Sequence, residues 1–239
     1  MADAIEYLRG FNFASLLARL LLAMLVGGLI GFEREKKRRP AGFRTYMLVA
    51  VGAALTMILG QYLSLMLAGR WAAQAAGTGT DVSRFGAQVI NGVGFIGAGT
   101  IIVTGRQEVK GLTTAAGLWA SACMGLAIGA GFFECVAIGF ALIALCMNVL
   151  PLIEDAVLSN SRNLNVYAEM DDIKCLGSIA ALMKAQGFRL YDTEISKRQN
   201  EHLSQIDAVF SVRLPRKLPH EEILALLSTA EGIISIEEI

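Results

Sequence analysis

The sequence predicts an α-helical membrane domain followed by a soluble α+β domain. Of the 239 residues, 54% are hydrophobic and only 18% are charged, and the mean hydropathy is +0.53. Residues 1–153 carry 12 Lys/Arg against 7 Asp/Glu, whereas residues 154–239 carry 9 against 14. An apolar, basic first part joined to a polar, acidic second part is typical of a membrane protein with a soluble tail. We therefore predict a transmembrane domain at 1–153, a linker at 154–162 and a cytoplasmic domain at 163–239.

Five segments of the first part are candidates for membrane spans, because a helix needs about 20 predominantly apolar residues to cross a bilayer. The third and fourth are diluted by glycine and polar residues, so four spans is the nearest alternative. A tight turn around Gly129–Gly131 separates the last two. The segments are 14–32, 45–67, 85–104, 112–131 and 132–153.

The orientation follows from the basic residues in the short loops, which favour the cytoplasmic side. Segment 33–44 contains six Lys/Arg and segment 105–111 adds two, against Arg9, Arg70 and Arg84 on the other side. Five spans then place the N-terminus outside and the tail in the cytoplasm. The loop at 33–44 either only sets this topology or also binds anionic lipid or a partner.

The stretch NGVGFIGAG at 91–99 contains the G-x-G-x-x-G spacing of dinucleotide-binding proteins. That fingerprint requires a buried strand before the glycines and a helix after them. The preceding residues 83–88 do not have a strand pattern, and the glycines lie inside an apolar run of membrane-spanning length. We therefore reject a nucleotide site.

Small residues four positions apart allow membrane helices to approach closely. We predict that such pairs pack helices together. The pairs are Gly27/Gly31, Gly94/Ala98, Gly117/Ser121 and Gly125/Gly129.

A polar stripe accompanies the glycines of the third span. Asp81, Arg84, Gln88 and Asn91 are three, four and three residues apart, which places them on one helix face. We favour the interpretation that the two amides join helices within the protein; the alternative is a polar vestibule for an ion or small solute. We also expect Arg19 and Glu134 to pair with each other, or with Asp81 and Arg84.

The sequence contains no motif that predicts catalysis or a bound cofactor. There is no Walker loop, no HExxH and no Cys/His cluster with metal-ligand spacing. The four cysteines form no CxxC pair, and three of them lie in apolar runs. We expect neither an enzyme nor a protein with a metal or cofactor.

The tail predicts the order βαββαβ, which is ferredoxin-like or ACT-like. Residues 164–170 alternate as a half-buried strand, and apolar residues then recur at helical spacing until Gly187. Strands at 189–196 and 205–214, a helix at 219–230 and a strand at 233–239 follow. The tail has no glycine-rich effector loop, so we favour a structural or dimerising role over ligand binding. Its acidic charge excludes nucleic acid.

Two long motifs resemble the MgtC/SapB family of membrane proteins. They are LLAMLVGGLIGFEREKKRRPAGFRT at 21–45 and DVSRFGAQVINGVGFIGAGTIIVTGRQEVKGLTTAAGLWASACMGLAIGAG at 81–131. With the spans between them, the resemblance covers nearly all of residues 15–150. One departure is the sequence Asp81-Val82-Ser83-Arg84, where the family commonly has Asp-Pro before the arginine. Part of the family also has a soluble ACT-like tail.

The resemblance implies a bacterial inner-membrane protein with about five spans that serves survival under magnesium limitation or a related stress. It favours a regulator that contacts another membrane complex, such as ATP synthase or a transporter. Apart from the resemblance, the glycine-rich helices and the ACT-like tail are candidate surfaces for a homo-oligomer. The alternative is a transporter or channel for magnesium or another small ion that uses the polar stripe. The motifs carry over as candidate functional positions Glu33, Arg34, Glu35, Arg39, Pro40, Gly42, Arg44, Thr45, Asp81, Arg84, Gln88, Asn91, Gly111, Leu112, Thr113 and Thr114.

Overall fold

The chain divides into two compact units, Met1–Leu150 and Pro151–Ile239. The structure is a computed structural model, and it describes residues 2–72, 81–103, 109–158, 162–172, 174–200, 203–215, 220–230 and 232–238. Each unit has a hydrophobic core of its own.

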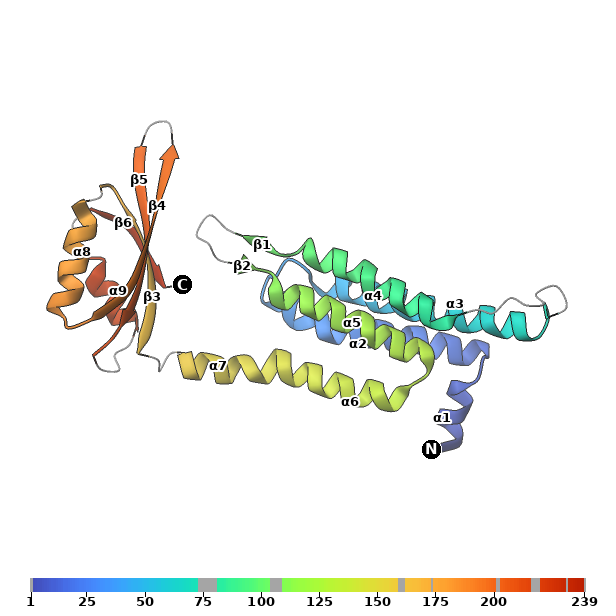
Figure 1. The fold of residues 1–239 in the computed structure, drawn as a ribbon. Coiled ribbons are helices and arrows are strands. Elements are labelled where there is room, and N and C mark those ends of the chain that lie inside the picture. The colour runs from blue at the N-terminus through green and yellow to red at the C-terminus, as the bar shows by residue number, and fades with distance from the viewer. Residues whose placement is uncertain are drawn as a thin grey trace. The chain divides into compact units, whose positions relative to one another are not determined.

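The first unit is a bundle of helices (Figure 1). A short hairpin, β1 (Ile102–Val103) with β2 (Val109–Lys110), precedes its fifth helix. The helices are α1 (Ala2–Arg9), α2 (Phe13–Lys36), α3 (Phe43–Ala68), α4 (Val82–Ala98), α5 (Leu112–Ala130) and α6 (Phe133–Ala144). We call the end where α2 stops and α3 and α5 begin the loop end, and the opposite end the Arg19 end.

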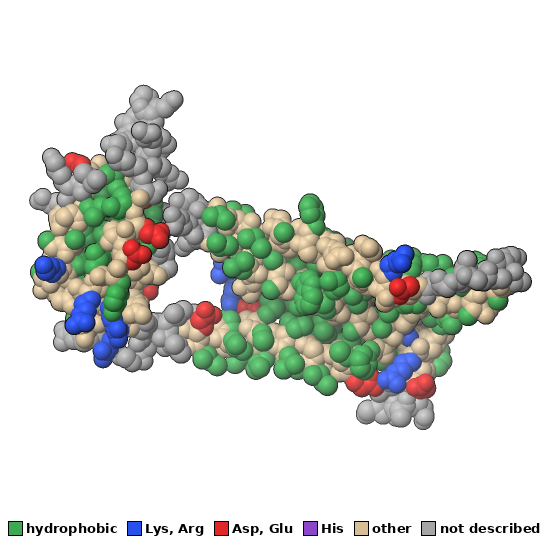
Figure 2. All heavy atoms as spheres, in the orientation of Figure 1, with side chains coloured by type: hydrophobic (Ala, Val, Ile, Leu, Met, Phe, Trp, Pro, Cys, Tyr) green, Lys and Arg blue, Asp and Glu red, His purple; other side chains and the backbone are tan. Residues whose placement is uncertain are grey.

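The described residues include four helices that are long and apolar enough to cross a membrane: α2, α3, α5 and the continuous helix at Phe133–Glu154. The predicted membrane protein is thereby confirmed. Helix α4, which is not among these four, has 17 residues, fewer than the roughly 20 needed to span a bilayer. Figure 2 shows hydrophobic side chains covering the middle of this unit and charged side chains gathered near its ends. Five spans remain a prediction.

The core of the bundle forms where α3 lies between α2 and α5. These helices approach so closely that several glycines have no room for a side chain. A Cβ at Gly27 would lie 2.7 Å from the Tyr46 carbonyl oxygen, and one at Gly125 would lie 2.2 Å from the Ala50 oxygen. Small residues therefore set the spacing of these helices, as is common in membranes.

Several element boundaries differ from the predicted ones. The first predicted span ends at 32, but α2 continues to Lys36 and takes the acidic residues of the loop into the helix. The third span was predicted to reach 104, but α4 ends at Ala98. Part of the predicted linker, 154–158, is helical and belongs to α7 (Leu150–Leu158).

A π-helical turn, η1 (Leu145–Val149), connects α6 to α7. Proline inside a helix lacks an N–H and its ring clashes with the carbonyl group four residues earlier. In this helix Pro151 follows directly after the π turn, in which Leu150 N–H donates to the Leu145 carbonyl oxygen, five residues back. The wider turn accommodates the proline without ending the helix.

The second unit has the predicted order βαββαβ, and its sheet order β4-β5-β3-β6 is antiparallel throughout. The two helices lie on one face of the sheet (Figure 1). The core is formed by alternate strand residues, such as Val166 opposite Phe210, and by the helix residues Ile179 and Leu227. The elements are β3 (Asn163–Met170), α8 (Lys174–Ala185), β4 (Arg189–Asn200), β5 (Leu203–Arg213), α9 (His220–Leu227) and β6 (Ile233–Glu238). This is the ferredoxin-like arrangement.

Candidate functional site

The loop end of the bundle contains a buried polar cluster that joins three helices. Arg34, near the end of α2, is 7% exposed and donates from Nη2 to Oγ1 of the fully buried Thr114 on α5, at 2.6 Å. The Tyr46 hydroxyl on α3 donates to the Thr114 carbonyl oxygen at 3.2 Å. The cluster thus brings together residues from the motifs EREK, FRTY and GLTT, which are far apart in the sequence.

The hydrogen bonding of this cluster is incomplete. Arg34 Nε and Glu33 Oε2 are buried without a hydrogen-bond partner in the described part of the chain. The other carboxylate oxygen of Glu33 pairs with Lys37 Nζ at 2.5 Å. A buried polar atom without a partner is unfavourable by about 1–3 kcal/mol. The cluster therefore retains one free donor and one free acceptor, unlike most buried groups.

Glu35 and Gly42 together fix the start of α3. The backbone N–H of Phe43, the first residue of that helix, donates to Glu35 Oε2 at 3.2 Å. A Cβ at Gly42 would lie 1.8 Å from the same oxygen, so a larger residue there would displace the carboxylate. The Glu35 side chain thus caps a helix whose own N-cap residue has no side chain to do so.

The loop between α2 and α3 presents a basic surface. Arg38 stands in the left-handed region, with φ at 51°, and the Arg39 N–H donates back to the Arg34 carbonyl oxygen to close the helix. Lys36, Arg38, Arg39, Pro40 and Arg44 are all exposed. Beside them is a hollow of about 610 Å³, lined by Phe32, Glu35, Gly42, Phe43, Arg44 and Thr45.

The two threonines at the start of α5 have different surroundings. Neither caps the helix, because its N-cap is Gly111, which has a φ of 98° and makes no side-chain cap bond. A Cβ at Gly111 would lie 2.0 Å from the Thr100 carbonyl oxygen, so this position also excludes larger residues. Thr114 points into the cluster, whereas Leu112 and Thr113 are exposed.

The polar stripe of α4 lies on the outside of the bundle. Asp81, Arg84, Gln88 and Asn91 are all exposed, and neither amide makes a side-chain hydrogen bond within the described part of the chain. The buried face of α4 is the opposite one, where Gly97 contacts Ala115. The amides therefore do not join helices of a single chain, and the favoured interpretation of this stripe is wrong in that respect.

Most of the predicted small-residue pairs pack against α3, but the pair on α4 lies on the outside of the bundle. Gly31, Gly117 and Gly129 lie against α3, as do Gly27 and Gly125. By contrast, a Cβ at Gly94 would meet nothing within 4 Å, and Ala98 is exposed.

At the Arg19 end, a second buried arginine is held by backbone carbonyl groups. Arg19 is 1% exposed and donates to the carbonyl oxygens of Leu8 at 3.0 Å, Arg9 at 2.8 Å and Gly129 at 2.9 Å. It also donates to the Gln61 side chain at 3.3 Å. Carbonyl groups at the end of a helix carry partial negative charge, which compensates the guanidinium.

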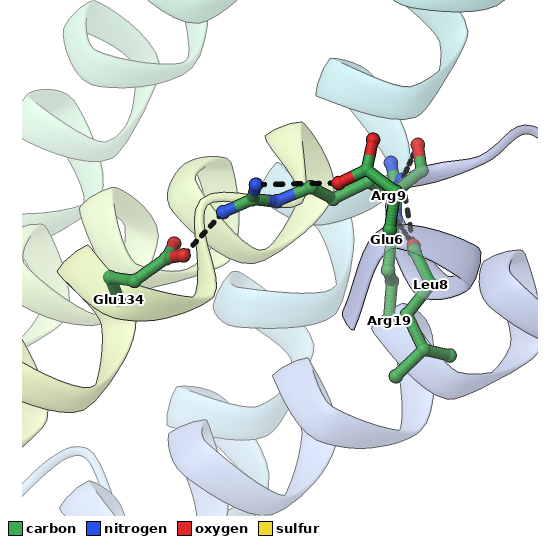
Figure 3. A network of polar contacts seen from close by, with 5 residues as sticks. All are labelled: Glu6, Leu8, Arg9, Arg19 and Glu134. Carbon is green, nitrogen blue, oxygen red and sulfur yellow. Dashed lines mark hydrogen bonds and ion pairs between the residues drawn. The ribbon is translucent and has the colours of Figure 1, made fainter. Parts of the chain in front are cut away.

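The predicted pair of Arg19 with Glu134 is wrong. Figure 3 shows Arg9 between the two carboxylates of Glu6 and Glu134, while Arg19 reaches the α1 carbonyl groups. The sequence could not indicate this, because backbone carbonyl groups are the same at every position.

Sequence reasoning also missed Tyr46 and Gln61. Tyr46 is fully buried; its ring lies against Gly117 and its carbonyl oxygen accepts from Ser121 at 3.1 Å. A tyrosine inside a glycine-rich apolar span is the available signal, because a buried phenol usually requires a hydrogen-bond partner.

The polar groups at the loop end form a candidate binding surface. The described residues contain no group of three His, Cys, Asp or Glu side chains arranged to hold a metal ion. The loop end instead combines buried charge, a hollow with aromatic walls and exposed arginines. Such a surface suits contact with a partner or an anionic lipid.

Comparison with known proteins identifies the family. Residues 20–156 match the MgtC family. The putative magnesium transporter YhiD of Escherichia coli is 37% identical over 225 residues, which is 92% of this chain and 96% of that protein. The protein MgtC of Brucella abortus is 33% identical and covers 89% of this chain and 87% of its own length. The protein SapB of Bacillus subtilis is 25% identical, with coverage of 93% and 94%.

The region that matches the family contains the candidate functional residues described above. The matched region includes the loop-end cluster, the basic loop and the whole of α4. Relatives that cover about nine-tenths of this chain include the second unit as well. The chain belongs to the MgtC family of membrane proteins.

Proposed function

We propose that this protein is a non-catalytic regulator in the bacterial inner membrane that contacts another membrane complex, such as ATP synthase or a transporter, during magnesium limitation or a related stress. Membership of the MgtC family and the magnesium-related name of the E. coli relative support the link to magnesium.

The observation that carries this proposal is the closed interior of the bundle. Where α3 meets α2 and α5, backbone and Cβ atoms are in contact, and Gly27, Gly125 and Gly129 leave no room even for a methyl group. The two buried arginines lie near opposite ends of the bundle. An ion path needs a route wide enough for the ion along the membrane, and the close contacts at these glycines leave no such route where α2, α3 and α5 meet.

The loop end is the surface that we assign to the partner. It is rich in arginine, which favours binding to protein surfaces and to anionic groups. The excess of basic residues in this loop supports a cytoplasmic position, with the N-terminus outside and the second unit also in the cytoplasm. The hollow beside Arg44 offers an apolar pocket bordered by charge.

A second candidate is an ion transporter, and the exposed stripe on α4 favours it. Amides and charges at membrane depth are often part of a pathway. In this chain the stripe would line a path only if another protein surface enclosed it.

The test is reconstitution of the purified full-length chain into vesicles, alone and together with ATP synthase. Alone, the chain is expected to give no magnesium uptake above empty vesicles. With ATP synthase, it is expected to change ATP-driven proton pumping, and Arg44→Gln should reduce that effect. Arg70→Gln is the matched control, because Arg70 is exposed at the opposite end.

One result would contradict the proposal, and another would exclude one of its two targets. Magnesium uptake that Asn91→Leu abolishes would make the protein a transporter. Unchanged proton pumping, with inserted and folded protein, would exclude ATP synthase as the target and would require the same assay with transporters.

A further inference from the structure

We propose that α4 is the interface through which two copies of this chain pair side by side in the membrane. The interface consists of Gln88, Asn91, Gly92 and Phe95, with Asp81 and Arg84 at its outer edge. This inference does not rest on the proposed regulatory role.

As the predicted third membrane span, α4 would expose a face that is unsuited to lipid. Gln88 and Asn91 lie near the middle of the helix, and at about 1.5 Å per residue Asn91 lies some 13 Å from its start. Both side chains are exposed and without hydrogen bonds in the described part of the chain. An amide in hydrocarbon without a partner is unfavourable by several kcal/mol. A protein surface that supplies hydrogen bonds is therefore required at this depth.

The same face is shaped for close approach of a second helix. A Cβ at Gly92 or Gly94 would meet nothing within 4 Å, so neither glycine is needed for packing inside the chain. Beside them Phe95 is 85% exposed, the most exposed of the large hydrophobic side chains in the described residues. Gly92 leaves a shallow groove on this face, and the neighbouring Phe95 has a ring that can fill the same groove on a second copy.

The residues of this face are complementary to themselves, which points to a second copy. Two chains with the same orientation in a membrane pair around a two-fold axis along its normal, so each residue meets its own equivalent at equal depth. An amide both donates and accepts. Asn91 can therefore bond to Asn91 of the second copy, and Gln88 to Gln88.

The charged end of the face has the same property. Asp81 and Arg84 are both exposed, carry opposite charges and lie three residues apart. A two-fold axis places Asp81 and Arg84 of one copy beside the same two residues of the other, so each Asp81 can pair with the Arg84 that lies three residues further along the second copy. Such a pair sets orientation more than affinity, because exposed ion pairs contribute little free energy.

Cysteine cross-linking in vesicles of purified protein tests the proposal. In a background with Cys123, Cys135, Cys146 and Cys175 replaced by serine, Gln88→Cys, Asn91→Cys and Phe95→Cys are each oxidised. We expect disulfide-linked dimers at these positions. Leu55→Cys on α3 and Leu142→Cys on α6 are controls, because they are 54% and 57% exposed at other helices. Equal cross-linking at all five positions, or none on α4, would overturn the proposal.

A second measurement does not depend on cysteine. Fluorescently labelled full-length chains in large vesicles are counted by photobleaching at increasing dilution. Gly92→Leu places a bulky side chain in the interface but in open space within the chain, so the fold is retained. We expect it to weaken dimerisation about tenfold or more, and an unchanged dimer fraction would contradict the assignment. Magnesium uptake is measured separately, so failure here and failure of the proposed function are distinguishable.

Discussion

The two ends of the bundle each contain a buried arginine on α2, and the two are satisfied to different degrees. Arg19 is 1% exposed and makes hydrogen bonds to four carbonyl groups besides Gln61. Arg34 is 7% exposed, donates to Thr114 and lies beside the Tyr46 hydroxyl, but its Nε has no partner among the described residues.

The difference separates a structural group from a candidate functional one. Arg19 holds the ends of α1 and α5 together, and little of its bonding capacity remains. Arg34 lies at the same end of the bundle as the hollow and the basic loop, and its Nε has no partner among the described residues. Buried polar groups in proteins are nearly always paired, so the loop end, where Arg34 Nε and Glu33 Oε2 are unpaired among the described residues, is where a function is to be sought. The following experiments test this difference between the two arginines and their surroundings.

The largest effect is expected for Arg19→Leu. It removes the donor for carbonyl groups of α1 and α5 and leaves them unpaired, which should reduce the free energy of unfolding by about 3–5 kcal/mol. For Arg34→Leu we expect only about 1–2 kcal/mol. Unfolding in mixed micelles of increasing SDS fraction measures both. Equal losses, or a larger loss at Arg34, would mean that the two ends do not differ as described.

A smaller effect is expected where α3 meets α5. Gly125→Ala brings a methyl group to 2.2 Å from the Ala50 oxygen, and the helices must separate. Overpacking of this kind lowers stability by about 1–3 kcal/mol. The matched control is Gly94→Ala, where the methyl group meets open space and the change should stay within about 0.5 kcal/mol. If the two variants unfold alike, the close contact is not present in the folded protein.

The variant Thr114→Val tests the hydrogen bond at the centre of the loop-end cluster. Valine has the same shape but cannot accept from Arg34, so the buried guanidinium loses its 2.6 Å hydrogen bond. We expect a loss of about 1–2 kcal/mol. Thr113→Val is the control, because Thr113 is the neighbouring residue and is exposed. A loss at Thr113 as large as that at Thr114 would remove the reason for assigning Thr114 to the cluster.

The smallest effect concerns an exposed carboxyl group at the Arg19 end. Asp81 caps α4, and hydrogen bonds from Ser83 lower its pKa below the ordinary carboxyl value. Its contribution is therefore complete above that ordinary value and is lost as the pH falls through the lowered pKa. Thermal unfolding between neutral pH and about pH 3 should show a smaller acid-induced loss for Asp81→Asn than for the unmodified chain. A loss of the same size in both would contradict this role.

Sequence patterns predicted the second unit more completely than the first. In β3 and β5 every second residue is apolar, and this local alternation is sufficient to place each strand and its buried face. In the first unit the lengths of α2 and α3 were also predicted within a few residues, because lipid imposes long apolar runs. The need for apolar residues in lipid does not reveal which face of a helix packs against the protein core and which faces lipid.

The polar stripe of α4 illustrates that limit. Its spacing correctly placed Gln88 and Asn91 on one face, but spacing does not say toward what a face points. In water a polar face would point outward; in a membrane the same residues were expected to point inward, and the structure has them outside. The partners of Arg19 were hidden for another reason, because they are backbone atoms. Only the folded chain shows which carbonyl groups lie within reach.

The position of Ala50 has a consequence for the order of assembly during synthesis. Its side chain fills the space left by Gly27 on α2, and its carbonyl oxygen lies against Gly125 on α5. The first contact becomes possible as soon as α3 enters the membrane. The second must wait until the ribosome has added 75 more residues. During that interval one side of α3 faces lipid or the insertion machinery, and the nascent protein is a helical hairpin that completes its core only when α5 arrives.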